Sequence, residues 1–198
     1  MERFSDLDTA FKQSWDMLYQ ASVNRNDPMR TPALATLDKA KPQVRTIVLR
    51  GVAIKERELL CFSDRRSPKV SQILETSTVE YLFYDPKEKI QIRASGETKL
   101  EWESETCRGY WKKLNIAGRS SYAAEVLPGA TQEVDASGLP PNWSATLPLQ
   151  LTDYAFENFC LLKTTVHYMD VLHLHSEGHQ RAGFWWEGEA WKQSWLIP

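Results

Sequence analysis

The chain has 198 residues, 25% of them charged, and a formal net charge of -2. A balance so near neutrality argues against nucleic acid as a partner, because surfaces that bind nucleic acid carry an excess of cations. No run of about 18 apolar residues occurs, which excludes a membrane-spanning helix; the acidic first residues lack the apolar core of a secretory signal, so we expect a cytoplasmic protein.

The first part of the chain predicts one covering helix followed by short strands. Apolar residues spaced three or four apart predict an amphipathic helix over 6–24, within a covering segment of residues 1–25. Strands are expected at 34–37, 44–54 and 59–63, with a hairpin turn over 38–42. Ser67 and Pro68 then predict a helix over 67–76, because a serine hydroxyl caps free amides and proline fits the first helical position. Its apolar face should carry Val70, Ile73 and Leu74.

The remainder of the chain is dominated by strands. They are expected at 79–84, 89–102, 159–165, 168–174, 182–186 and 191–196, with a helix over 103–113 and a polar segment over 115–124. In the strand 89–102, apolar residues at even positions alternate with Gln91, Arg93 and Ser95, so one face is apolar. Residues 128–148, rich in glycine and proline, predict a loop insertion. Without a strand–helix–strand repeat, the pattern favours one domain over 1–198, an antiparallel barrel with helices packed outside.

Cations gather near the predicted helix 67–76. Lys69 lies in its first turn and Arg65 and Arg66 precede it, although cations there oppose the helix dipole. Such a cluster is explained if an anion, such as a phosphate monoester, binds at this helix N-terminus; a merely solvated basic turn is the alternative. Arg45 and Arg50, separated by an odd number of positions in one strand, should face opposite sides unless a bulge intervenes, and both could equally be ordinary exposed strand residues.

Three further groups of residues are weaker candidates. Gln91, with Arg93 and Ser95, could line a cavity for a flat heterocycle, or could belong to a solvated sheet face. His173 and His175 share a strand face, yet no third ligand of clear spacing accompanies them, so no metal site is expected. The cysteines, at positions 61, 107 and 160, fit neither a disulfide framework nor a zinc site and predict buried thiols.

These motifs resemble those of a known family in order and spacing. The residues are Arg45-Thr-Ile-Val-Leu-Arg50, Phe62-Ser63 with Ser67-Pro68-Lys69, and Gln91-Ile-Arg-Ala-Ser-Gly96; Tyr110-Trp111, Arg119 and the closing 191–198 extend the likeness. They are similar to the flavin-binding motifs of pyridoxamine 5'-phosphate oxidases and their relatives, and closest to a cyanobacterial and plant-type subgroup. The resemblance implies a split β-barrel that binds FMN between the two subunits of a homodimer.

The resemblance also implies roles for single residues. Arg45 and Lys69 would hold the FMN phosphate with help from Ser63 and Ser67, while Phe62 belongs to the same flavin-binding motif. Arg50 matches a position, usually lysine, that reaches the flavin and the substrate. Gln91 would contact the flavin ring or the ribityl chain, and Arg119 stands where the oxidases carry a glutamine that reaches FMN.

The chain departs from the vitamin oxidases at their substrate site. Those enzymes carry an Arg-x-His motif where this chain has His179-Gln180-Arg181, and arginine and serine where it has Leu114 and Gly118. Tyr110, His179 and Arg181 are therefore substrate candidates for an unidentified small molecule, and no catalytic acid or base stands out. The first expectation is an FMN-dependent oxidoreductase. A flavin-binding carrier or sensor without turnover is the second, and a haem-binding relative with His173 or His175 as axial ligand is the third.

Overall fold

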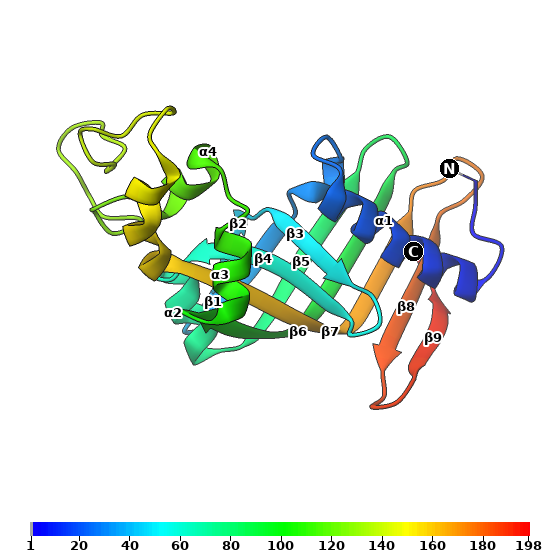
Figure 1. Cartoon of the computed structure of the whole chain (residues 1–198). Coiled ribbons are helices and arrows are strands. Elements are labelled where there is room, and N and C mark those ends of the chain that lie inside the picture. Colours follow the sequence, from blue (N-terminus) through cyan, green and yellow to red (C-terminus); the bar gives the residue numbers. More distant parts are fainter. Residues whose placement is uncertain (1) are drawn as a thin grey trace.

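Nine antiparallel strands form one curved sheet, which the computed structural model describes over residues 2–198 (Figure 1). Neighbouring strands follow the order β2–β1–β5–β6–β7–β4–β3, and β8 and β9 extend the sheet from β7. The strands are β1 (Ala33–Asp38), β2 (Lys41–Thr46), β3 (Leu49–Ala53), β4 (Glu58–Asp64), β5 (Thr78–Asp85), β6 (Ile90–Trp102), β7 (Phe159–His173), β8 (Gln180–Trp186) and β9 (Trp191–Leu196). The predicted antiparallel barrel with outer helices is confirmed, and it is split because β2 and β3, at the two ends of this order, do not pair within the described residues.

The prediction of a single strand over 44–54 is wrong, because two strands, β2 and β3, cover these residues. β2 ends at Thr46 and pairs with β1, whereas β3 begins at Leu49 and pairs with β4. Between them the amide of Ile47 donates to the carbonyl of Pro32 at 3.0 Å, so the chain leaves one end of the sheet and joins the other. An apolar, β-branched run gives no sign of such a break, because every residue in it suits a strand. Arg45 and Arg50 consequently lie on different strands, on the two sides of the split.

The two strands predicted over 159–165 and 168–174 are in fact one, β7, which is 15 residues long. Its pairing with β6 shifts so that Ser95 lies opposite Tyr168 and Gly96 opposite Val166, which leaves His167 without a partner in β6. This is a β-bulge, and it bends the strand. A Cβ atom on Gly96 would lie 2.2 Å from the carbonyl oxygen of Thr165, so the close approach of the two strands requires glycine there.

Helices pack on the outside of the sheet. They are α1 (Leu7–Val23), α2 (Pro68–Glu75), α3 (Glu105–Trp111) and α4 (Ile116–Arg119), with 3-10 helices at Pro28–Arg30, Ser120–Tyr122 and Leu149–Asn158. Asp6 caps α1 by accepting a hydrogen bond from the Thr9 amide at 2.7 Å. The helices predicted over 6–24, 67–76 and 103–113 match α1, α2 and α3, while 149–158 was not predicted. On α2, Val70 and Ile73 are buried as expected, but Leu74 is 64% exposed.

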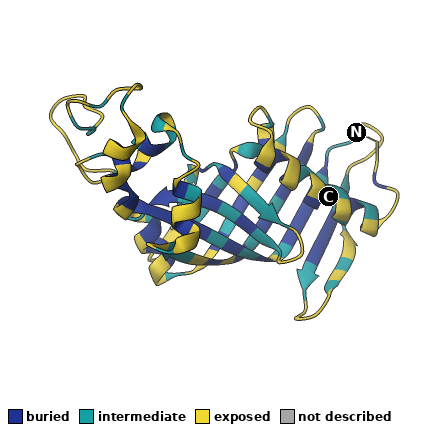
Figure 2. Cartoon of the chain, viewed as in Figure 1, coloured by how far each residue is buried: buried dark blue, intermediate teal, exposed yellow. Residues whose placement is uncertain are grey.

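Two clusters of apolar side chains form the core. The larger fills the barrel and includes Tyr81 and Phe83, and Trp15 and Leu18 of α1 close over it. The smaller lies under α3 and the 3-10 helices, around Trp111. The three cysteines are buried with free thiols, as predicted. Figure 2 shows the resulting contrast between dark buried strands and exposed helix faces.

A long segment beside α4 contributes only Ala123, Leu139 and Trp143 to the smaller cluster. Residues 123–148 contain no helix or strand and are mostly exposed, as the yellow trace in Figure 2 shows. Pro128 and its neighbours nevertheless return to the start of α2, where they line cavities. Within residues 2–198, no helix is long and apolar enough to cross a membrane.

Candidate functional site

A cavity of about 300 Å³ opens at the split between β2 and β3. Its walls come from the break 46–48, the end of β4, the start of α2, and Ser121, Tyr122 and Pro128. Five of the predicted residues line it together: Arg50, Phe62, Ser63, Ser67 and Lys69. The contribution of 121–128 was not predicted, because nothing in a polar loop sequence indicates which residues fold back over a distant helix.

Lys69 is the central cation of this cavity. Its Nζ lies 3.1 Å from the Oγ atoms of Ser63 and Ser67, and those two hydroxyls lie 3.1 Å from each other. Among the described residues no carboxylate lies within salt-bridge distance of it. Burial lowers the pKa of Lys69, and the positive charge of Arg45 lowers it further. A half-buried ammonium flanked only by hydroxyls is a site for an external anion.

The predicted capping role of Ser67 is wrong. Its hydroxyl donates to the carbonyl of Asp64 at 2.7 Å and faces Lys69, and no side chain caps the first amides of α2. The nearby acid does not supply the missing counter-charge either. Asp64 is buried and forms a two-pronged pair with Arg66, whose Nη2 lies 2.7 Å and Nε 3.1 Å from its carboxylate oxygens. The negative charge of Asp64 favours the charged form of Lys69, but the Asp64 carboxylate forms no ion pair with that ammonium among the described residues.

Arg45 lies behind the cavity and does not line it. Its guanidinium donates to the carbonyl of Gln43 at 2.9 Å and to the amide oxygen of Gln72 at 3.1 Å, and it also donates to the hydroxyl of Thr36. These bonds tie β2 to β1 and α2. Burial lowers the pKa of Arg45, yet guanidinium remains charged at any physiological pH. Its charge reaches Lys69 from the β2 side.

Arg50 of β3 also lines the cavity, and it lies over an aromatic ring. Its guanidinium carbon lies 5.4 Å from the centroid of the Phe62 ring, and the Phe62 and Tyr110 centroids lie 5.3 Å apart. Within residues 2–198 Arg50 makes no hydrogen bond or ion pair, so its charge is available to a ligand. The cavity thus has a hydroxyl-lined cationic end and an aromatic end with a free guanidinium.

Gln91 does not line this cavity. It lines another cavity, of about 330 Å³, on the outer face of β1, β5 and β6 beside Val44, Leu82 and Arg93. Arg93 there pairs with Glu80 at 2.7 Å. The inner face of β6 is apolar and buried as predicted, since Ile90, Ile92 and Ala94 are fully covered.

The guanidinium of Arg119 is buried and makes hydrogen bonds within the chain. It is 4% exposed and donates to the Leu149 carbonyl at 2.9 Å and to the Asp153 carboxylate at 2.9 Å. Its guanidinium carbon also lies 4.5 Å from the Trp111 ring centroid. These contacts anchor the 3-10 helix Leu149–Asn158, and Arg119 does not line the cavity, although Ser121 and Tyr122 just after it do.

The C-terminal candidates lie on other surfaces. Arg181 of β8 forms a two-pronged pair with the buried Asp170, at 3.1 and 2.7 Å, and His179 is exposed on the loop before β8. His173 is buried, with its ring centroid 5.2 Å from that of His175. In the part of the chain that the structure describes, no three histidine, cysteine or acidic side chains gather as a metal site would require.

A family model matches the N-terminal part of the sequence. Residues 12–101 match the family model described as "Pyridoxamine 5'-phosphate oxidase, FMN-binding domain". The matched region contains the cavity residues on β3, β4 and α2, together with Arg45 and Gln91, whereas Tyr110, Arg119, His179 and Arg181 lie outside it. No curated protein matches the sequence.

Solved structures show the same fold. A pyridoxamine 5'-phosphate oxidase-related, FMN-binding protein from Nostoc punctiforme superposes with a TM-score of 0.74 at 22% identity, covering 95% of this chain and 97% of that one. PhzG from Burkholderia lata, in complex with tetrahydrophenazine-1-carboxylic acid, gives 0.70 at 20% identity, covering 97% and 93%. General Stress Protein 26 from Bacillus anthracis gives 0.51 at 15% identity, covering 80% and 93%. The predicted split barrel is therefore confirmed.

Proposed function

Because residues 12–101 match the family model of the pyridoxamine 5'-phosphate oxidase FMN-binding domain, we propose that the protein is an FMN-dependent oxidoreductase that acts on a small molecule. FMN supplies two-electron redox chemistry at its flavin ring, and the protein positions the ring and tunes it through nearby charges. We further propose that the protein works in the cytoplasm, since its three cysteines are free thiols, as is usual in a reducing compartment.

The observation that carries this proposal is the environment of Lys69. A half-buried ammonium between two serine hydroxyls, with Arg45 behind it and no carboxylate partner among the described residues, matches the needs of a phosphate monoester. A volume of about 300 Å³ is at the low end for ligand pockets. One chain would therefore hold the phosphate end of FMN and cover only part of the cofactor.

A second copy of the chain would complete the site. The outer face of β1, β2 and β5 exposes apolar side chains, of which Val44 is 66% and Leu82 41% exposed, around the cavity that holds Gln91. An apolar sheet face of this kind is typical of a subunit interface. We propose that this face forms the homodimer, and that Gln91 and the C-terminal residues His179 and Arg181 act on the cofactor bound by the partner chain.

We infer that the substrate is a carboxylic acid on a partly reduced aromatic ring system, which can give up two hydrogens to the flavin. Arg50 offers an unpaired guanidinium beside Phe62 and Tyr110, which suits a carboxylate on an aromatic ring. The PhzG structure, which shares this fold, holds tetrahydrophenazine-1-carboxylic acid, a molecule of that class. Pyridoxamine phosphate is a weaker candidate, because Leu114, where the oxidases carry arginine, packs against the core cluster around Trp111.

Cofactor binding is tested by titrating the purified protein with FMN and with riboflavin while following flavin fluorescence. We expect Lys69→Ala to weaken FMN binding by roughly 10- to 100-fold, since it loses a charge-assisted contact with phosphate, and Arg45→Ala to weaken it less, since it removes a positive charge from behind the cavity. Riboflavin, which lacks the phosphate, should bind both variants and the wild type alike. Arg65→Ala is the matched control, because Arg65 pairs with Glu103 outside the cavity. Equal losses for both flavins would refute the phosphate assignment.

Turnover is tested by oxygen consumption of the FMN-loaded protein with partly hydrogenated aromatic carboxylic acids, pyridoxamine phosphate and reduced nicotinamides. Oxidation of one of these acids that is lost in Arg50→Met would support the substrate class. Tight FMN binding without turnover of any of them would favour the carrier or sensor hypothesis. A Soret band in the purified protein would instead indicate haem, with His173 or His175 as the residue to mutate.

A further inference from the structure

Residues 125–138 form a loop whose two ends meet at its base. The amide of Glu125 donates to the carbonyl of Gly138 at 2.8 Å, and Gly138 has a φ of +70°, a conformation that glycine adopts without strain. A surface loop closed in this way is an Ω-loop, a class of loop that frequently has a function. In Figure 1 the segment that contains it stands out from the end of the sheet, beyond α4.

Little holds this loop against the barrel. Among the described residues, no hydrogen bond or ion pair joins 125–138 to a strand or helix. None of its side chains belongs to either core cluster, and Leu127 is 60% exposed. A segment with so few buried contacts opens locally at a low cost in free energy. The loop can therefore move as a unit about its base.

The tip of the loop separates two cavities. Pro128 lines the cofactor cavity on one side, and on the other it lines a cavity of about 430 Å³ together with Ser71 and Gln72 of α2. Gly129 lies next to Pro68 at the start of α2, because a Cβ atom added to it would be 3.9 Å from the Pro68 Cγ. The second cavity gives the tip room to move away from the first one.

Arg66 connects the base of the loop to the cofactor cavity. Its Nη2 donates to the carbonyl of Ala124 at 2.9 Å, and the same nitrogen lies 2.7 Å from the carboxylate of Asp64, which lines that cavity. The two carbonyls before Ala124 accept from Asn158 and Tyr154 at 2.9 and 3.0 Å, so the chain is fixed up to that point. Arg66 therefore holds the chain where the loop begins.

We propose that the 125–138 loop is a lid over the cofactor cavity, that Arg66 latches it, and that FMN enters and leaves when the latch opens and the tip moves into the second cavity. This inference rests on the proposed function, because it takes FMN as the occupant of the first cavity. The latch contacts only the protein, so weakening it should speed entry and exit by the same factor and leave the dissociation constant unchanged. Loss of a cofactor ligand raises that constant instead.

The latch is tested by FMN exchange kinetics of the full-length protein, followed by flavin fluorescence after mixing and after dilution. Arg66→Lys keeps the charge pair with Asp64, but a single ammonium cannot also reach Ala124 as the planar guanidinium does. We expect both rate constants to rise roughly tenfold, the effect of losing one charge-assisted hydrogen bond. Arg65→Lys is the control, since Arg65 pairs with Glu103 outside both cavities, and its rates should match those of the wild type.

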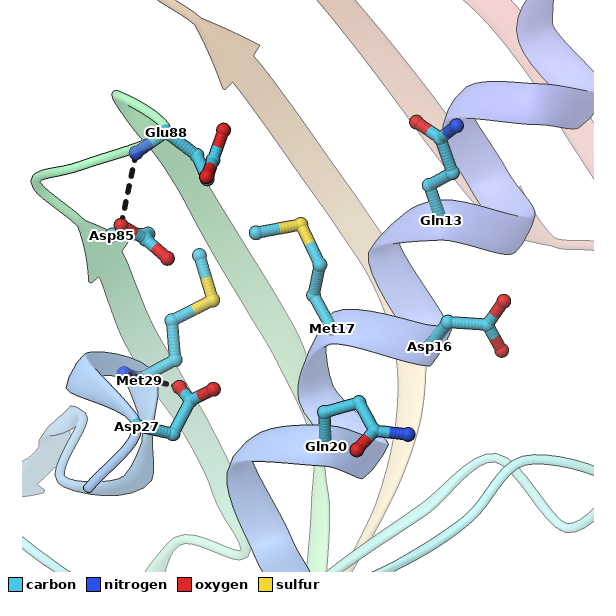
Figure 3. A pocket seen from close by; sticks show the side chains of 8 residues that line it. All are labelled: Gln13, Asp16, Met17, Gln20, Asp27, Met29, Asp85 and Glu88. Atoms are coloured by element: carbon cyan, nitrogen blue, oxygen red, sulfur yellow. Dashed lines mark hydrogen bonds between the residues drawn. The ribbon is translucent and has the colours of Figure 1, made fainter. Parts of the chain in front are cut away.

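A second variant tests the space into which the tip moves. Ser71 is exposed on α2 and lines the second cavity but not the cofactor cavity. Ser71→Leu narrows that space, so both rate constants should fall about fivefold or more. Gln20→Leu is the matched control. It adds the same side chain beside a cavity of about 440 Å³ under α1, which shares no lining residue with the other two (Figure 3), and it should leave both rates unchanged.

Each result supports or overturns the lid. Unchanged rates in Arg66→Lys or in Ser71→Leu would overturn it, and so would a faster release of FMN from Arg66→Lys without faster entry, because Arg66 would then act as a cofactor ligand. Failure of the proposed function looks different, since Lys69→Ala would then bind FMN as tightly as the wild type does. A wild-type protein that binds no FMN would refute the proposed function and the lid together.

Discussion

Lys69 and Arg45 are both cations near the same cavity, but their hydrogen-bond partners give them different roles. Arg45 uses its planar set of donors to join β1, β2 and α2, so its charge is fixed behind the cavity. Lys69 keeps its ammonium at the surface of the cavity between two hydroxyls. The arginine therefore sets the electrostatic potential, and the lysine presents a donor that a ligand can reach.

The pH dependence of FMN affinity should report on Lys69. Burial holds its pKa below the usual 10.5 in the free protein, and a bound phosphate favours the charged ammonium and raises that pKa. Binding then takes up a proton once the pH exceeds the lowered pKa, so affinity falls as pH rises there. Dissociation constants measured from about pH 7 to pH 10 should show this decline in Arg45→Ala but not in Lys69→Ala. A decline that persists in Lys69→Ala would assign it to another group.

The three cysteine thiols should be unreactive toward thiol reagents in the folded protein. Burial raises the pKa of Cys61 to about 12 and that of Cys160 to about 12, and Cys107 is fully buried. Because the thiolate is the reactive form, a disulfide reagent at about pH 8 should label none of them in the native state and all three in denaturant. Rapid labelling of any thiol in the native protein would contradict this placement.

Among the elements, the β6–β7 pair determines the bend of the sheet. Its bulge at His167 depends on the close approach of Gly96 to the Thr165 carbonyl, and the carbonyl of Val166 also accepts from the guanidinium of Arg57 at 3.0 Å. Sequence patterns could not locate this bulge. Val166 and Tyr168 both suit a strand, but His167 between them interrupts the alternation of apolar and polar residues, and such an interruption also predicts the end of one strand and the start of another.

Gly96→Ala should lower the free energy of unfolding by roughly 2–4 kcal/mol, because the new methyl group forces the two strands apart. Gly109→Ala is the matched control, since a methyl group added at Gly109 in α3 would meet no other atom within 4 Å. That change should raise stability by about 0.5–1 kcal/mol, as alanine favours a helix over glycine. Urea denaturation curves measure both. Equal effects of the two substitutions would show that the strand contact is not tight.

At the scale of the whole molecule, the proposed homodimer depends on the apolar outer face of β1, β2 and β5. Val44→Lys with Leu82→Lys places charges on this face and should convert the dimer to a monomer in size-exclusion chromatography with light scattering. The monomer should also bind FMN more weakly, because the partner no longer covers the cofactor. Val134→Lys, at a 74% exposed loop position, is the control and should leave the mass unchanged. A dimer that survives the double substitution would place the interface elsewhere.

The sequence predicted α1, α2, α3 and most strands, and it singled out Ser63, Ser67 and Lys69, because these depend on local spacing and on residues close together in the chain. It could not show that β2 and β3 separate at Ile47, or that Ser121 and Pro128 return to the cavity, since those contacts join distant segments. Arg119 illustrates the opposite error. In the sequence, an arginine in a polar segment is expected to be exposed and able to bind a ligand. Only the fold shows that Arg119 is enclosed by the Leu149–Asn158 helix.

The position of β7 in the sheet has a consequence for synthesis. β7 pairs with β4, β6 and β8, and it enters the chain only at Phe159, long after β4 ends at Asp64. While the ribosome translates the residues between them, the edge of β4 that will meet β7 has no partner, and unpaired strand edges invite aggregation. The newly made chain must therefore expose an unpaired strand edge until β7 has been synthesised. A chaperone that shields β4 during this interval should raise the yield of folded protein, and FMN added before β7 is complete should have little effect.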